Sequence, residues 1–230
     1  MTKRFLIFFS SILLIFSCST KKDIIYVQDS SSKKIYGVNF VEYKVQIDDV
    51  LKIDIKTNSA ELLSSASTSF NNTREGILYN GFQVDTSGFI SFPSIGKVYV
   101  MGLTVREIKE TIVANLKEKG IFNDLIIDVK LVNSKIVVLC EVNSPGTHLF
   151  FKNNLNIFEA IGLAGGLTIN GERENIRVIR KVDDNNIVLE IDLTSTSSIQ
   201  ANSFQIFSND IIIVNPNTNR VKNAGIIGNS

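Results

Sequence analysis

Apolar residues recur at every second position in several short stretches of this 230-residue chain, with polar or charged residues between them. In residues 51–56, leucine or isoleucine alternates with lysine or aspartate, and residues 43–47 alternate in the same way up to the pair Asp48-Asp49. Successive side chains of a strand point to opposite faces of its sheet, so this period of two predicts strands with one solvated face. We therefore expect small sheets as the framework, with Asp48-Asp49 as the turn between the first two strands.

One segment of the first half has instead the pattern of an amphipathic helix. Thr104 can accept a hydrogen bond from the amide of Glu107 while the Glu107 side chain reaches back, which is a capping box. An apolar residue recurs at every fourth position after it, and Gly120 ends the segment. The apolar stripe consists of Ile108, Ile112 and Leu116. We expect this stripe to pack against the strand at residues 51–55.

The other segments of the first half predict strands and one loop. Residues 82–92 alternate on both sides of a turn at residues 85–88, where Gly88 supplies a positive φ, and this predicts a hairpin. Residues 125–132 predict a strand, whereas residues 58–73 are rich in serine, asparagine and threonine and predict a long surface loop. The first domain therefore runs strand, strand, hairpin, helix, strand.

A second unit begins at Lys135. A turn at residues 144–146 contains Pro145 and Gly146, and Asn156 caps a short helix that the pair Gly165-Gly166 ends. The predicted elements are strands at residues 135–142, 147–151, 175–180 and 187–193, a helix at residues 157–164, and a final pair of strands within residues 204–214. The predicted fold class is α+β, with two small mixed-sheet domains.

The charge balance excludes one class of partner. The chain has 24 lysine and arginine residues against 23 aspartate and glutamate residues. Such a balance provides no basic surface to neutralise phosphates, so we expect no nucleic acid as a partner. A chain that is 20% charged and 44% hydrophobic is also not of the disordered class.

The N-terminus has the pattern of a lipoprotein export signal. Lys3 and Arg4 precede an apolar run at residues 5–16, which is shorter than the helix of about 20 residues that spans a membrane. Ser17 and Cys18 follow this run, as a small residue and a cysteine do in a bacterial lipobox. We expect cleavage before Cys18 and a diacylglycerol on its thiol. The alternative is an ordinary signal peptide that ends at Cys18.

Cysteine usage limits the chemistry of the mature chain. Lipidation of Cys18 would leave Cys140 as the remaining thiol, so we expect no disulfide. Cys140 lies in an apolar run and is predicted to be a small buried hydrophobic residue of a strand. The alternative is a catalytic pair with His148, the one histidine. One histidine and one cysteine do not complete a zinc site, and we expect neither a metal ion nor a cofactor.

Two further patterns have both a chemical and a structural interpretation. Asp48-Asp49 and Asp183-Asp184 could be the paired carboxylates of a glycosidase, but adjacent residues of an extended chain point apart and turns favour aspartate. Gly165-Gly166 could cradle a phosphate, but a phosphate loop precedes a helix whereas this pair follows one. We interpret all three pairs as structural and expect no enzyme activity.

Short motifs rich in turn residues follow one another along the chain. They lie at residues 43–53, 84–96 and 102–104 in the first half, and at residues 141–146, 159–166 and 209–214 in the second half. The first three resemble the signatures of the polysaccharide export outer-membrane lipoprotein family, and the last three are similar to those of a soluble-ligand-binding β-grasp domain. The resemblance covers residues 41 to about 216.

This resemblance implies a domain organisation. Residues 1–17 would be the signal peptide, 18–40 a lipidated tether, 41–132 a polysaccharide export domain of α/β type, 134–216 a β-grasp-like domain and 217–230 a tail. The tail has no segment that could cross a bilayer, so either the chain is truncated or another protein makes that passage. Ten residues of the family motifs would form turns that define the fold, and we do not expect them to bind sugar. They are Asp49, Gly88, Pro93, Gly96, Gly102, Pro145, Gly146, Gly165, Gly166 and Asp210.

The resemblance also implies a function. The protein would form a ring homo-oligomer in the periplasm, anchored by lipid in the outer membrane, through which capsular polysaccharide or exopolysaccharide leaves the cell. An inner-membrane copolymerase, commonly with a tyrosine-kinase partner, would dock beneath the ring. The alternative function is that of a monomeric envelope lipoprotein that binds a glycan or another soluble ligand.

Overall fold

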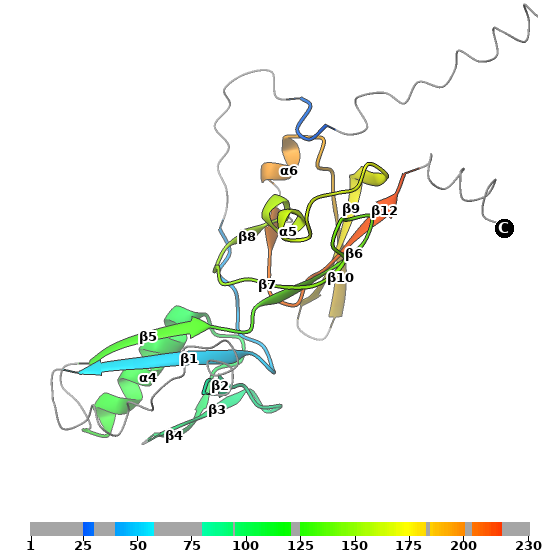
Figure 1. Ribbon diagram of the computed structural model, residues 1–230. Helices are drawn as coiled ribbons and strands as arrows, with labels where there is room; N and C mark the ends of the chain where they lie inside the picture. The colour runs from blue at the N-terminus through cyan, green and yellow to red at the C-terminus, as the bar shows by residue number, and fades with distance from the viewer. Residues whose placement is uncertain are drawn as a thin grey trace, which may run out of the picture.

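The computed structural model describes residues 25–29, 40–57, 80–93, 95–120, 125–182, 185–200 and 204–217. These residues form two units that follow one another along the chain, each around its own hydrophobic core (Figure 1). Cys18, the apolar run before it, the predicted loop at residues 58–73 and the pair Asp183-Asp184 lie outside the described ranges. No helix within those ranges is long and apolar enough to cross a membrane.

The first unit is a small sheet with one helix packed against it (Figure 1). Strands β1 (Val50–Thr57), β2 (Phe82–Gln83) and β5 (Leu125–Leu131) are antiparallel, in the order β2-β1-β5. Strands β3 (Phe89–Phe92) and β4 (Gly96–Tyr99) form a separate hairpin. Helix α4 (Val105–Glu118) covers the sheet.

Both periodicities of the first unit are confirmed. Leu51 and Ile53 of β1 are buried, whereas Lys52 and Asp54 between them form a partly exposed ion pair of 3.3 Å. The apolar stripe of α4 is buried in the same core as β1. The predicted capping box is present, because the Thr104 hydroxyl accepts from the amide of Glu107 and the Glu107 carboxylate accepts from the amide of Thr104.

The predicted strand at residues 43–47 is wrong. This stretch has one isolated bridge, between Lys44 and Thr104, and Ile47 is 38% exposed. The predicted turn at Asp48-Asp49 is present, and it forms because the Asp49 carboxylate accepts the amide of Gln46 at 2.8 Å. A turn that closes so early limits the pairing of this stretch to the bridge at Lys44 and the backbone hydrogen bonds of Val45 with Gly102 and Leu103.

The predicted hairpin at residues 82–92 is also wrong. Its first strand, β2, pairs with β1, and its second strand, β3, pairs with β4. The Asp85 carboxylate accepts the amides of Ser87 and Phe89, both at 2.9 Å, and shapes the loop between the two strands, while the rings of Phe82 on β2 and Phe92 on β3 still pack 5.1 Å apart. Gly88 has the expected positive φ, +84°, and a Cβ there would lie 2.7 Å from the Cβ of Met101.

The second unit is a five-stranded mixed sheet with the order β10-β9-β12-β6-β7. Strand β12 is parallel to β6, and the other neighbours are antiparallel. The sheet strands are β6 (Lys135–Cys140), β7 (Gly146–Leu149), β9 (Gly171–Val182), β10 (Asn185–Ile191) and β12 (Ile211–Pro216). Helix α5 (Ile157–Leu163) packs in the core, as predicted, and the one-turn helix α6 (Ser197–Gln200) lies nearby (Figure 1).

Two predictions in the second unit need correction. The expected final strand pair does not form, because β11 (Gln205–Ile206) pairs with β8 (Leu155–Asn156) while β12 enters the main sheet. Cys140 is exposed and not buried. Ile136 and Val138 point inward on β6, but a φ of +72° at Cys140 breaks the alternation and turns its side chain outward.

Residues 25–29, which the sequence places in the tether, lie against the second unit, and we call them the strap. The amides of Val27 and Gln28 donate to the carbonyls of Leu193 and Thr194. The Asp29 carboxylate accepts the amide of Thr196 at 2.7 Å, and this hydrogen bond is the main reason that the pKa of Asp29 is lowered. The strap thus connects the N-terminal part of the chain to the second unit.

Candidate functional site

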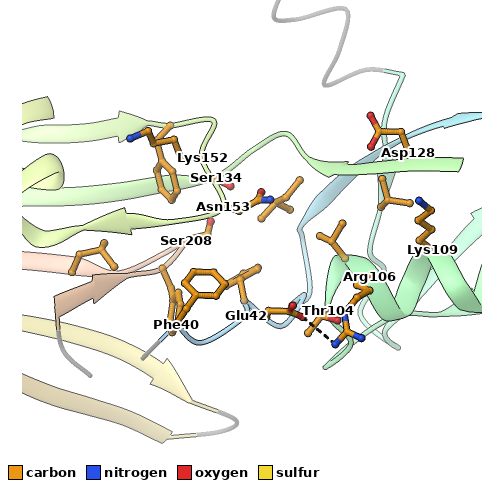
Figure 2. Close-up of a pocket in the computed structure, with 17 residues that line it drawn as sticks. Phe40, Glu42, Thr104, Arg106, Lys109, Asp128, Ser134, Lys152, Asn153 and Ser208 are labelled. Carbon is orange, nitrogen blue, oxygen red and sulfur yellow. Dashed lines mark ion pairs between the residues drawn. The ribbon is translucent and has the colours of Figure 1, made fainter. Parts of the chain in front are cut away.

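A cavity of about 360 Å³ lies between the two units, and we call it the cleft (Figure 2). Ligand pockets in proteins range from about 300 to 1,000 Å³, so the cleft is of the size that holds a small ligand or one unit of a polymer. Its lining comes from β5, the start of α4 and residues 40–43 on one side, and from residues near β6, β7 and β11 on the other.

The wall formed by the first unit is charged. Thr104, Arg106 and Lys109 of the α4 region and Asp128 of β5 face the opening (Figure 2). Arg106 forms an ion pair with Glu42 at 3.6 Å, and both side chains are largely exposed. An exposed pair at this distance contributes little to stability, so either partner can exchange it for a ligand.

The wall formed by the second unit is polar and aromatic. Ser134, Phe150 and Asn153 line it, and Figure 2 shows the Asn153 amide directed into the space between the units. Lys152 also lines the cleft and contacts the Glu159 carboxylate at 2.5 Å. Phe40 lies on the same side of the opening and is 49% exposed.

Two aromatic rings join the units beneath the cleft. Tyr43 of the first unit and Phe207 of the second have ring centroids 6.0 Å apart. The Tyr43 hydroxyl donates to the Asp49 carboxylate at 2.9 Å. Burial raises the pKa of Asp49 to about 6, although the Gln46 amide and the Tyr43 hydroxyl oppose the rise by stabilising the anion. Burial and the neighbouring Asp49 also raise the pKa of Tyr43.

The second unit has a buried ion pair behind Phe207. Arg180 donates two hydrogen bonds to Asp210, at 2.9 and 2.7 Å, and its guanidinium lies 4.2 Å from the Phe207 ring centroid. The Asp210 carboxylate also accepts the amide of Phe207. Burial raises the pKa of Asp210, and Arg180 limits that rise. The pair therefore fixes Phe207 in the wall of the cleft.

A third contact closes the junction. The side chain of Gln205 accepts from the amide of Val41 at 3.0 Å and donates to the carbonyl of Val41 at 2.7 Å. The Gln205 side chain thus satisfies both the amide and the carbonyl of Val41, as the backbone of a neighbouring strand would. Together with the Tyr43–Phe207 contact, it attaches the segment before β1 to the second unit.

None of the ten predicted fold-defining residues lines the cleft. Asp49 and Asp210 lie directly behind it, through Tyr43 and Phe207. The glycines lie in turns with a positive φ, at Gly88, Gly96, Gly102, Gly146, Gly165 and Gly166. The pair Gly165-Gly166 ends α5, where the Gly166 amide donates to the carbonyl of Ile161. Pro93 precedes β4, and Pro145 precedes β7.

Sequence reasoning missed the residues that build the junction. The alternation predicts a strand at Tyr43, which the structure does not have, and the motifs of the sequence include neither Gln205 nor Arg180. A signal for Arg180 does exist, because it occupies an inward position of β9 after Ile176 and Val178, where a buried charge requires a partner. Nothing in the sequence indicates that Gln205 bonds to Val41.

The catalytic alternatives gain no geometric support. The Asp48 carboxylate accepts from Gln83 while Asp49 bonds to Tyr43, so the two side chains do not share a site. His148 contacts the carbonyl of Ser144 at 2.8 Å, and no contact with Cys140 is present among the described residues. Within the described ranges, no three histidine, cysteine, aspartate or glutamate residues are grouped as metal ligands.

Comparisons with known proteins divide the chain in two. Residues 39–132 match the family model for the polysaccharide biosynthesis/export protein, and residues 134–214 match the model for the SLBB domain. The chain is also similar to the EPS I polysaccharide export outer membrane protein EpsA of Ralstonia solanacearum, with 28% identity over 140 residues. That alignment covers 59% of this chain and 36% of the relative, so the chain spans about a third of the relative's length.

Proposed function

The chain belongs to the polysaccharide biosynthesis/export family, with an SLBB domain after its export domain, and from this membership we propose that it is a subunit of a ring through which polysaccharide leaves the cell. The observation that carries the proposal is the order of the two matches, which follow one another almost without a gap. The domain boundaries that we propose are residues 41–132 and 134–216. The name of the Ralstonia relative supports export at the outer membrane.

The junction between the units supports a structural role. A conduit wall requires domains that keep a fixed relation while polymer moves past them. The Tyr43–Phe207 ring contact and the Gln205–Val41 hydrogen bonds provide such a connection, and the Arg180–Asp210 pair holds Phe207 in place for it. We propose that the lumen offers many weak polar contacts and no bond-breaking residue, because a polymer that is held tightly at each sugar cannot move.

The proposed partners are those that an export ring requires. The chain would assemble with copies of itself and receive polymer from an inner-membrane copolymerase, with a tyrosine kinase as a further partner. A lipid on Cys18 would hold it in the outer membrane, and Ser19 lacks the aspartate that retains many enterobacterial lipoproteins in the inner membrane. Labelled fatty acid should therefore enter the wild-type protein and not a Cys18→Ala variant.

The decisive experiment is sizing of the full-length protein in detergent, together with surface polysaccharide in a deletion strain. The proposal predicts a ring-sized oligomer and a loss of surface polymer that the wild-type gene restores. A monomer that leaves surface polymer unchanged would instead favour the monomeric ligand-binding lipoprotein. A variant protein that forms normal rings, but whose strain loses the surface polymer while a hydrolytic activity is gained or lost, would favour an enzyme.

A further inference from the structure

We propose that the cleft between the export and SLBB domains is a binding subsite for one acidic sugar unit, a pyranose that carries a carboxylate. The inference rests on the proposed export function for the choice of a saccharide. The position of the site, its charge preference and its stacking platform come from the described residues alone. It assigns the cleft a role that neither domain match provides.

Two polar side chains of the cleft are available to bind a ligand. The side chains of Lys109 and Asn153 line the cleft and form no hydrogen bond or ion pair with any residue in the described ranges. Most other polar groups nearby have partners, such as Asp210 with Arg180. Figure 2 shows Asn153 on the second-unit side of the cleft and Lys109 on the first-unit side. An ammonium and an amide placed in this way can bind one ligand from two sides.

The aromatic lining indicates a sugar ring. Phe40 is half exposed at the mouth of the cleft and stacks on no other ring among the described residues. Phe150 lines the wall of the second unit on the same side and is buried. The C–H face of a pyranose covers such a ring, while its hydroxyl groups need short polar partners. The hydroxyls of Ser134 and Ser208 and the Asn153 amide provide these.

The charges favour an anionic sugar. Lys152 of the lining is paired with Glu159, and Asp128 is paired with Lys130. This leaves Arg106 with Glu42 and the additional cation Lys109 at the cleft. Glu42 holds Arg106 only through a long, exposed ion pair. A ligand carboxylate can replace Glu42 on Arg106 in a bidentate contact and reach Lys109 one helical turn further along α4.

The weakness of this site fits its place in a conduit. The cleft is open to solvent, so salt screens its charges and the affinity stays low enough for release. A succession of such subsites around a ring would guide an acidic polymer without trapping it. Each chain would contribute one subsite, at the level of the junction between its domains.

Calorimetric titration of the detergent-solubilised full-length protein tests the proposal, with a trimer of galacturonic acid and a neutral glucose trimer as probes at equal ionic strength. We expect saturable binding of the acidic trimer and binding of the neutral trimer that is weaker by about tenfold or more. Lys109→Glu and Phe40→Ala should each lower the affinity for the acidic trimer about tenfold. Lys117→Glu, the same charge change on an exposed part of α4 away from the cleft, should not.

Three results would overturn the proposal: no saturable binding of the acidic trimer, equal affinity for the neutral trimer, or equal losses in Lys109→Glu and Lys117→Glu. Thermal melting identifies a variant that has not folded, and Asn153→Ala at an exposed position then replaces it. The outcome is separable from that of the export proposal. A ring whose cleft binds neither trimer refutes the subsite alone, whereas a monomer that binds the acidic trimer refutes the ring alone.

Discussion

Asp49 makes stability depend on pH at the scale of a single residue. Its pKa of about 6 lies above the ordinary value of 3.8. The folded state therefore holds the proton more tightly than the unfolded chain does. The contribution to stability is complete below pH 3.8 and is lost as the pH rises through about 6.

An Asp49→Asn variant tests this dependence. It cannot ionise, so relative to the wild type it should gain stability between pH 4 and pH 7, by up to about 3 kcal/mol. Thermal melting at both pH values provides the measurement. Glu118→Gln, an exposed change at the end of α4, is the control and should give the same difference at both pH values. A constant difference for Asp49→Asn would show that its carboxylate is already ionised at pH 4.

Arg180 carries a second prediction at this scale. Arg180→Ala would leave Asp210 buried without its partner, and the expected loss is about 3 to 5 kcal/mol of unfolding free energy. Arg177→Ala on the same strand removes a hydrogen bond to the neutral Asn215 and should cost about 1 kcal/mol. Chemical denaturation measures both values. Equal losses would mean that the ion pair adds nothing beyond ordinary packing.

The sequence predicts backbone requirements better than it predicts partners. The positive φ at Gly88 and Gly165 could be predicted because local turns and helix ends require it. The roles of Asp49 and Asp210 as turn formers were only half of what they do, since both also take part in the domain junction. That second role depends on particular partners, namely Tyr43 for Asp49 and Arg180 for Asp210, and no local pattern identifies these pairings.

Helix α4 is the element in which local signals and packing agree most closely. Ile112→Ala would remove a fully buried side chain from the core that α4 shares with β1 and β5. The expected cost is about 2 to 5 kcal/mol. Glu110→Ala on the exposed face of the same helix is the control and should change stability by less than about 0.5 kcal/mol. Unchanged melting of Ile112→Ala would refute the packing of this helix.

At the scale of elements, the sequence predicts which stretches are strands but not which strands pair. Residues 82–83 and 89–92 are strands as expected, yet each pairs with a different neighbour. The Asp85 side chain shapes the loop between them, and this loop could be predicted as a turn but the strand partners could not. No local pattern indicates the pairing of β12 either, because its parallel partner β6 and its antiparallel partner β9 both lie far from it in the chain.

The whole molecule depends on contacts between parts that are distant in sequence. The segment before β1 belongs to the export domain but bonds to Gln205 of the SLBB domain. The strap lies even earlier in the chain and binds the last part of that domain. The two domains are therefore held together at a junction, and the N-terminal part of the chain is attached to the second domain rather than the first.

The strap gives a prediction about how the protein lies on its membrane. Ile25 lies seven positions after Cys18, and an extended chain over seven positions spans about 25 Å. If Cys18 carries the lipid, the strap therefore keeps the SLBB domain within about that distance of the bilayer surface. Quenching of a fluorophore on the SLBB domain by brominated lipid should then exceed quenching of one on the export domain.

Loss of the strap should abolish this difference. Tyr26 packs edge-on against Phe158, and Asp29 binds Thr196, so a Tyr26→Ala, Asp29→Ala double variant should release the segment. Hydrogen exchange at the amides of Val27 and Gln28 should accelerate about tenfold or more, while the core amides keep their protection. Glu110→Ala on the exposed face of α4 is the control, because it lies in the first unit away from the strap. Equal exchange and equal quenching in the double variant and the wild type would show that the strap does not position the anchor.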